Sequence, residues 1–199
     1  MQAKDINAIF RTAIIDYHVQ DSVDTVFVPK FTEDTFSALL YQKNWIDTVQ
    51  WHFEDIIRDP KGKPVFLMTI KRRIDASNQH RTDVVEQLDE FINDSLKGVK
   101  VEENARLNSE TPAWLLDKMS ILQLKIYHFE VQVAFTGQSD ALQKSVEEKL
   151  HILKIQEQDL AQCFNELMAD LQAGSKYMRL YKQMKMYNDP QLNPVLKGQ

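Results

Sequence analysis

The chain has 199 residues, 43% of them hydrophobic and 27% charged, with a formal net charge of −5. This length and apolar content predict one domain, residues 1–199, with its own core. The acidic balance argues against nucleic acid, whose phosphates need a clustered basic face. No apolar run approaches the roughly 18 residues that span a bilayer, and the lone Cys163 has no disulfide partner. We therefore expect a cytoplasmic chain without membrane insertion.

The spacing of apolar residues predicts an all-α, antiparallel bundle of five long helices followed by a short C-terminal helix. Glycine and proline are scarce, five and six residues, and most of them stand where helices should end. In chain order the expected helices are residues 5–18, residues 32–58 with Thr32 as N-cap, residues 65–96, residues 112–133, and residues 140–173. The short helix would carry Tyr177, Met178, Tyr181 and Met184, interleaved with Lys176, Arg179, Lys182 and Lys185 on a solvated face.

The second expected helix carries polar residues beside its apolar face. At 100° per residue, His52 falls on the edge of that face and should be at least partly buried. Asp55 lies one turn further on the same flank, whereas Glu54 points away and can pair with Arg58 at i+4.

The third expected helix has polar residues on its apolar stripe. Ser77, Asn78 and Arg81 occupy stripe positions, and residues 75–83 include a single apolar side chain, Ala76. An unpaired guanidinium in the interior would cost several kcal/mol, so Arg81 requires a carboxylate or an anionic ligand. Two interpretations follow: a buried ion-pair network that holds the bundle in register, or a site that opens to solvent.

The fourth expected helix has two apolar lines and should therefore lie centrally. Asp117 and His128 share the second line, but eleven residues separate them by about 16 Å along the axis, so they cannot bind one metal together. We expect Asp117 to meet the polar centre of the third helix. His128 lies at another level along the helix axis. A lone histidine on an apolar face is usually an ordinary core residue.

Motifs with a known mechanism are missing. A di-iron bundle needs two inward Glu-x-x-His pairs, and only Glu148 with His151 fits, on an exposed face. There is no phosphate-binding loop, nucleophile elbow or paired-cysteine motif. No cofactor or metal is expected. A divalent metal, if bound, would be held by His52, Asp55, Asp75 and Asp117, and acid–base chemistry would use His52 oriented by Asp55.

Three segments together resemble a bacterial family known as domain of unknown function 4254. They are Trp51-His52-x-Glu54-Asp55, the run from Lys71 through Ile74-Asp75, Asn78-Gln79 and Arg81 to Asp83, and Thr111-Pro112 with Asp117-Lys118-x-Ser120-Ile121-Leu122-x-Leu124-Lys125-Ile126-Tyr127-His128. The resemblance implies a single helical domain in the bacterial cytoplasm, associated with genes for cell-surface polysaccharide or lipopolysaccharide synthesis. It brings no activity, cofactor or catalytic residue.

These observations favour a binding or accessory domain whose polar layer takes an anionic or sugar-like small molecule. The alternatives are a metal-assisted hydrolase or transferase using His52, Asp55 and Asp75, and a structural bundle that forms homo-oligomers. The candidate ligand-binding residues are His52, Asp55, Lys71, Asp75, Asn78, Gln79, Arg81, Asp117, Lys125 and His128.

Overall fold

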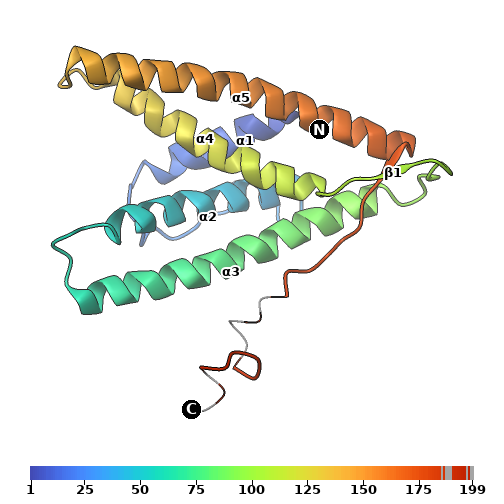
Figure 1. The fold of residues 1–199 in the computed structure, drawn as a ribbon, viewed down its shortest axis with the longest axis horizontal. Helices are drawn as coiled ribbons and strands as arrows, with labels where there is room; N and C mark the ends of the chain where they lie inside the picture. Colours follow the sequence, from blue (N-terminus) through green and yellow to red (C-terminus); the bar gives the residue numbers. More distant parts are fainter. Residues whose placement is uncertain (185, 187–189, 196, 198–199) are drawn as a thin grey trace.

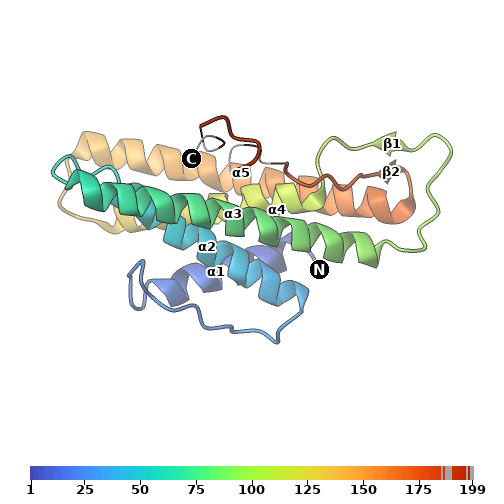
Figure 2. The ribbon, with the colours of Figure 1, turned by 90° about the horizontal axis from the view of Figure 1, so that it is seen from below.

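A computed structural model of the chain describes residues 1–184, 186, 190–195 and 197. Five helices make up most of it: α1 (Ala3–Tyr17), α2 (Phe36–Ile56), α3 (Pro64–Ser95), α4 (Pro112–Ala134) and α5 (Asp140–Ala173). The only strands in this part of the chain are β1 (Arg106–Leu107) and β2 (Lys176–Tyr177), which pair in parallel. The predicted all-α bundle of five helices is therefore confirmed, as Figures 1 and 2 show.

The helices from α2 to α5 alternate in direction along the bundle (Figure 1). Short connections join α2 to α3 and α4 to α5, and each of these pairs packs as an antiparallel hairpin. α1 differs, because the long segment of residues 18–35 carries the chain back before α2 begins. α1 therefore runs in the same direction as α2: Ala3 shares a core cluster with Leu40, and Tyr17 stacks on His52 at the other end.

The helix boundaries follow local capping. Ser139 accepts a hydrogen bond from the Leu142 backbone N–H and starts α5, and Gly174, with a φ of 80°, ends it. α2 begins later than predicted, because the N-cap is Thr35 and not Thr32. The hydroxyl of Thr35 accepts from the Ala38 N–H and donates to the Thr32 carbonyl, after a turn in which Asp34 has a positive φ.

α4 lies at the centre of the bundle, as its two apolar lines predicted. It contacts each of the other four helices. The main core cluster draws on all five helices and includes Ile6, Phe10, Leu40, Ile46, Val84, Leu88, Leu116, Met119 and Phe164. A second cluster, containing Phe53, Ile70 and Ile74, lies toward the other end of α3. The polar stretch of α3 separates these two clusters.

The short C-terminal helix predicted around Tyr177 is wrong. After Gly174 the chain forms β2, whose neighbouring backbone pairs with the segment before α4: the Arg106 N–H donates to the Ser175 carbonyl and the Asn108 N–H to the Tyr177 carbonyl. Residues 178–184 are not helical, and Lys185 lies outside the described residues. Lys182 instead contacts two acidic residues of α3, Glu86 and Glu90. Backbone pairing and these contacts outweigh the local helical spacing.

Candidate functional site

A network of four charged side chains lies between α2, α3 and α4. Lys43, fully buried, forms ion pairs with Asp47 and, at 2.9 Å, with Asp117. From α3, the Arg81 Nε lies 3.1 Å from the other oxygen of Asp47, and its Nη2 donates to Asp117 at 2.6 Å. Two positive and two negative charges cancel, so the bundle buries no net charge here. We call these four residues the charged layer.

Helical spacing and two neutral residues hold the charged layer in place. Lys43 and Asp47 stand one turn apart on α2, so they face the same direction. The Ser120 hydroxyl of α4 donates to Asp47 at 2.5 Å, and the Asn44 amide donates to that hydroxyl at 2.9 Å. Because all these groups are buried, α2 and α4 are fixed in one register.

Ser77 and Asn78, the other polar residues of the α3 stripe, are satisfied by Gln50 of α2. The Gln50 amide nitrogen donates to Asn78 at 2.8 Å, and the Ser77 hydroxyl donates to the Gln50 oxygen at 2.9 Å. The polar gap in the α3 stripe is thus matched by polar residues on α2.

The charged layer is not sealed from solvent. A pocket of about 330 Å³ opens beside it, within the range that small organic ligands occupy. Asp47 and Arg81 of the charged layer line it, and the Arg81 side chain is 25% exposed. The remaining lining residues are Gln50, Trp51, Glu54, Asp55, Arg58, Ile121 and Leu124.

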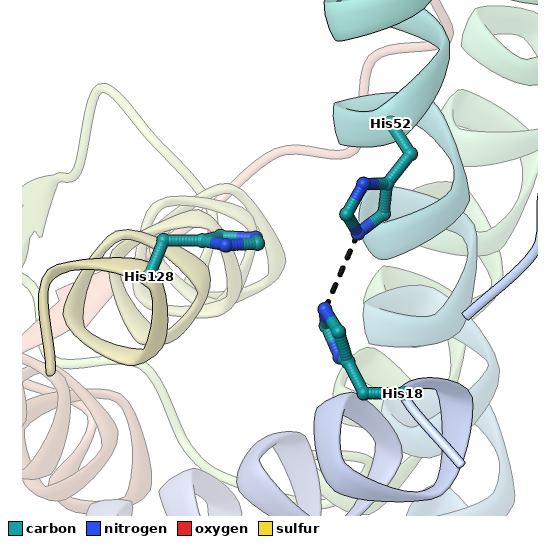
Figure 3. Close-up of side chains that lie close together, drawn as sticks. All are labelled: His18, His52 and His128. Atoms are coloured by element: carbon teal, nitrogen blue, oxygen red, sulfur yellow. Dashed lines mark hydrogen bonds between the residues drawn. The ribbon is translucent and has the colours of Figure 1, made fainter. Parts of the chain in front are cut away.

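A second cluster of polar side chains joins α1, α2 and α4. His18, His52 and His128 each offer a ring nitrogen, and these nitrogens lie within 4.8 Å of one another (Figure 3). The Nε2 atoms of His18 and His52 are 3.3 Å apart. Trp51 stacks on the His128 ring with centroids 4.8 Å apart, so it connects this cluster to the pocket. We call the three residues the histidine cluster.

Burial favours the neutral form of two of these imidazoles. It lowers the pKa of His128 to about 4, helped by the neighbouring His52 and His18. Burial, with a contribution from His18, also lowers the pKa of His52. Neutral imidazole is the form that binds metals or accepts a proton.

The structure brings some of the predicted site residues together. Arg81 has carboxylate partners, as the stripe argument required, and Asp117 meets the polar centre of α3. The His52 Nδ1 lies 3.7 Å from Asp55, and Glu54 pairs with Arg58.

Other predicted residues lie apart from these two groups. Lys71 and Asp75 form an exposed ion pair on α3, the exposed Gln79 donates to Asp83, and Lys125 is exposed on α4. His52, Asp55, Asp75 and Asp117 therefore do not converge as a metal site.

Sequence reasoning missed three central residues, Lys43, Asp47 and His18. A signal for the first two was present, since Lys43 and Asp47 stand at i, i+4 on the apolar side of α2 and could have been matched to Arg81 and Asp117. His18 closes α1 and carries no local pattern that separates it from an ordinary helix end.

The comparisons with known proteins assign a family to the chain. No curated protein and no solved structure matches it. A family described as "Protein of unknown function (DUF4254)" matches residues 37–180. This range includes α3 to α5 and all of α2 except its first residue, with the charged layer, His52 and His128, but not α1 or His18. No helix among the described residues is long and apolar enough to cross a membrane. The match extends over most of the chain, and the protein belongs to the DUF4254 family.

Proposed function

We propose that the protein is a non-enzymatic binding domain whose pocket beside the charged layer holds a polyhydroxylated, sugar-like molecule. One observation carries the proposal: the Arg81 guanidinium is held by two buried carboxylates, Asp47 and Asp117, while its remaining surface opens into a pocket lined by Trp51. A donor fixed in this way loses little side-chain entropy when it meets a ligand.

The charges around the pocket favour a neutral ligand over an anion. Three carboxylates line it, those of Asp47, Glu54 and Asp55, against two guanidinium groups. Both guanidinium groups are already paired, Arg58 with Glu54 and Arg81 within the charged layer. An added phosphate or sulfate would have to compete with these carboxylates, whereas hydroxyl groups can donate to the carboxylates and accept from the guanidinium groups.

Trp51 supplies the apolar part of such a site. Its ring packs on His128 and also lines the pocket, together with Ile121 and Leu124. A rigid aromatic surface bordered by carboxylates and an amide is complementary to a sugar ring, which has apolar faces and hydroxyl edges. A sugar-like ligand agrees with the association with cell-surface polysaccharide synthesis that the family resemblance implies.

The hydrolase alternative has less support. It needs His52, Asp55 and Asp75 together, but Asp75 pairs with Lys71 on the exposed side of α3. His52 does not line the pocket, whereas Asp55 does.

The test is a ligand screen on the full-length protein by ¹⁵N–¹H NMR, with neutral monosaccharides, their phosphates and inorganic phosphate. We expect neutral sugars to shift backbone signals around residues 47–58 and 81. The variant Trp51→Leu should weaken binding by about tenfold, or 1.4 kcal/mol.

Trp114→Leu is the matched control, because Trp114 is partly buried against the main core and does not line the pocket. It should leave sugar affinity unchanged. Binding of inorganic phosphate without binding of any sugar would reject the ligand class. Equal affinity in wild type and Trp51→Leu would reject the pocket.

A further inference from the structure

We infer that His18, His52 and His128, with Asp21 as a fourth ligand, form a binding site for a divalent transition metal of the zinc class. The site goes beyond the proposed sugar pocket and does not depend on it. Its three imidazoles come from the C-cap of α1, from α2 and from α4, and their rings point toward a common space (Figure 3). Only the tertiary packing of these helices brings them together.

The hydrogen bond of His18 determines its tautomer, and therefore which ring nitrogen offers a lone pair to the cluster. Its Nδ1 lies 2.7 Å from the carbonyl oxygen of Ile14, which can only accept, so Nδ1 carries the proton. The Nε2 of the neutral ring is then unprotonated and faces His52. A ligand histidine bonded through one nitrogen to a backbone carbonyl is the usual arrangement at protein metal sites.

His52 has a carboxylate near the ring nitrogen that faces away from His18, although too far for a direct hydrogen bond. Its Nδ1 faces the Asp55 carboxylate at 3.7 Å, and its Nε2 faces the Nε2 of His18 at 3.3 Å. If Nδ1 carries the proton toward the carboxylate, two lone pairs face each other at 3.3 Å. If Nε2 carries it, the Nε2–H donates to the Nε2 of His18, but a bare Nδ1 faces the carboxylate. A cation between the two Nε2 atoms removes this conflict.

The surroundings of His128 favour a metal ion over a proton shared by His18 and His52. Its Nε2 is buried and has no hydrogen-bond partner among the described residues. A proton between His18 and His52 would leave this buried atom unsatisfied, which is unfavourable. A metal ion accepts a third nitrogen. The stacked Trp51 ring holds the His128 imidazole in position.

Asp21 stands where a fourth ligand is needed. Its Oδ1 is 3.9 Å from the Nε2 of His18 and 3.8 Å from the Nε2 of His52. It follows α1 with a positive φ of 48°, a conformation that aspartate tolerates better than most residues. Its side chain is 60% exposed, so the site is accessible to ions from solvent.

The donor set and spacing suit zinc. Three imidazole nitrogens and one carboxylate match the ligands and the tetrahedral coordination that Zn²⁺ prefers. Zinc–nitrogen bonds of about 2.0–2.1 Å place neighbouring ligand nitrogens roughly 3.3–3.4 Å apart. The two Nε2 atoms already have this separation, at 3.3 Å. His128 and Asp21 need to move inward by side-chain rotation.

The experiment measures Zn²⁺ binding to the full chain by titration calorimetry after treatment with a chelator, with Co²⁺ as a spectroscopic probe. We expect one ion per chain and the strong visible absorption of tetrahedral cobalt. Each of His18→Ala, His52→Ala and His128→Ala should weaken binding by more than about 100-fold, because loss of even an outer-shell partner costs 10–100-fold. Asp21→Asn, in an exposed turn, should weaken it by about tenfold.

The remaining two of the five histidines, His80 and His151, are exposed and serve as controls. Their alanine variants should bind Zn²⁺ as the wild type does. A measurement on the wild type protects against variants that fail to fold: in ¹⁵N-histidine NMR, Zn²⁺ should shift the imidazole signals of His18, His52 and His128 and leave the other two in place. Absence of binding, a shift confined to His80 or His151, or unchanged affinity in His128→Ala would overturn the inference.

Discussion

Replacement of Lys43 by methionine tests whether the charged layer is a coupled unit. The variant keeps the length of the side chain but removes its charge, so Asp47 and Asp117 face only Arg81 and one negative charge stays buried. Removal of one partner from a buried ion pair costs about 3–5 kcal/mol. Arg81 still contacts both carboxylates, at 3.1 and 2.6 Å. We therefore expect the lower end, a loss of about 3 kcal/mol in the free energy of unfolding.

Urea unfolding followed by circular dichroism measures this loss. The matched control is Lys71→Met, which breaks a pair with the same i, i+4 spacing, to Asp75. That pair is about half exposed, and its loss should change the free energy of unfolding by less than about 0.5 kcal/mol. Comparison of the two variants separates the effect of burial on stability from the effect of the i, i+4 spacing.

The double variant Lys43→Met, Asp47→Asn tests the charge argument directly. It restores neutrality, with Arg81 and Asp117 as the remaining pair, and the new amide oxygen can still accept from Ser120. We expect it to be more stable than Lys43→Met alone. If the loss of unfolding free energy in the double variant instead equals the sum of the losses in Lys43→Met and Asp47→Asn within about 0.5 kcal/mol, charge balance does not govern the layer and the reasoning fails.

Two further predictions concern Asp89 of α3 and the end of α5. Burial, with a contribution from Glu86, raises the pKa of Asp89 above its ordinary value. The protonated carboxyl therefore stabilises the folded state below about pH 4. This stabilisation is lost as the pH rises through the raised pKa of Asp89. Unfolding curves from pH 4 to 7 should show the wild type losing stability relative to Asp89→Asn, and a pH-independent difference would contradict this. Gly174→Ala should destabilise the chain by at least about 1 kcal/mol more than Gly98→Ala, measured by thermal unfolding. Both residues have positive φ, at a cost of about 1–2 kcal/mol to alanine, but only at Gly174 would the new methyl group overlap the Lys100 carbonyl. Equal losses of stability in the two variants would show that the positive φ alone, and not the overlap with Lys100, sets the cost.

Much of the candidate site could be anticipated from the sequence. Arg81 on an apolar stripe required a carboxylate or an anionic ligand, because an unpaired buried charge is costly. Asp117 lay on the second apolar line of α4, so helical periodicity offered it as one partner, and the two side chains do form an ion pair. The i, i+3 spacing also placed Asp55 beside His52. These inferences depend on one helix at a time, or on two helices whose buried faces must meet.

Contacts that need three helices were outside the reach of such reasoning. His18, His52 and His128 are far apart in sequence, and nothing local shows that α1 runs parallel to α2, so that its C-terminal end reaches them. Lys43 is a different case, because its i, i+4 spacing to Asp47 on the apolar side of α2 was visible in the sequence. Only its second partner, Asp117, comes from another helix, α4.

By itself, the sequence determined the helices, their buried faces and the need to neutralise Arg81, because hydrophobic periodicity and the cost of burying charge act locally. Only the tertiary structure decided the direction of α1, the strand β2 that follows Gly174, the balance of the charged layer and the meeting of the three histidines. These depend on long-range packing and on backbone pairing between distant segments, as in the parallel contact of β1 with β2. Local spacing carries no information about either.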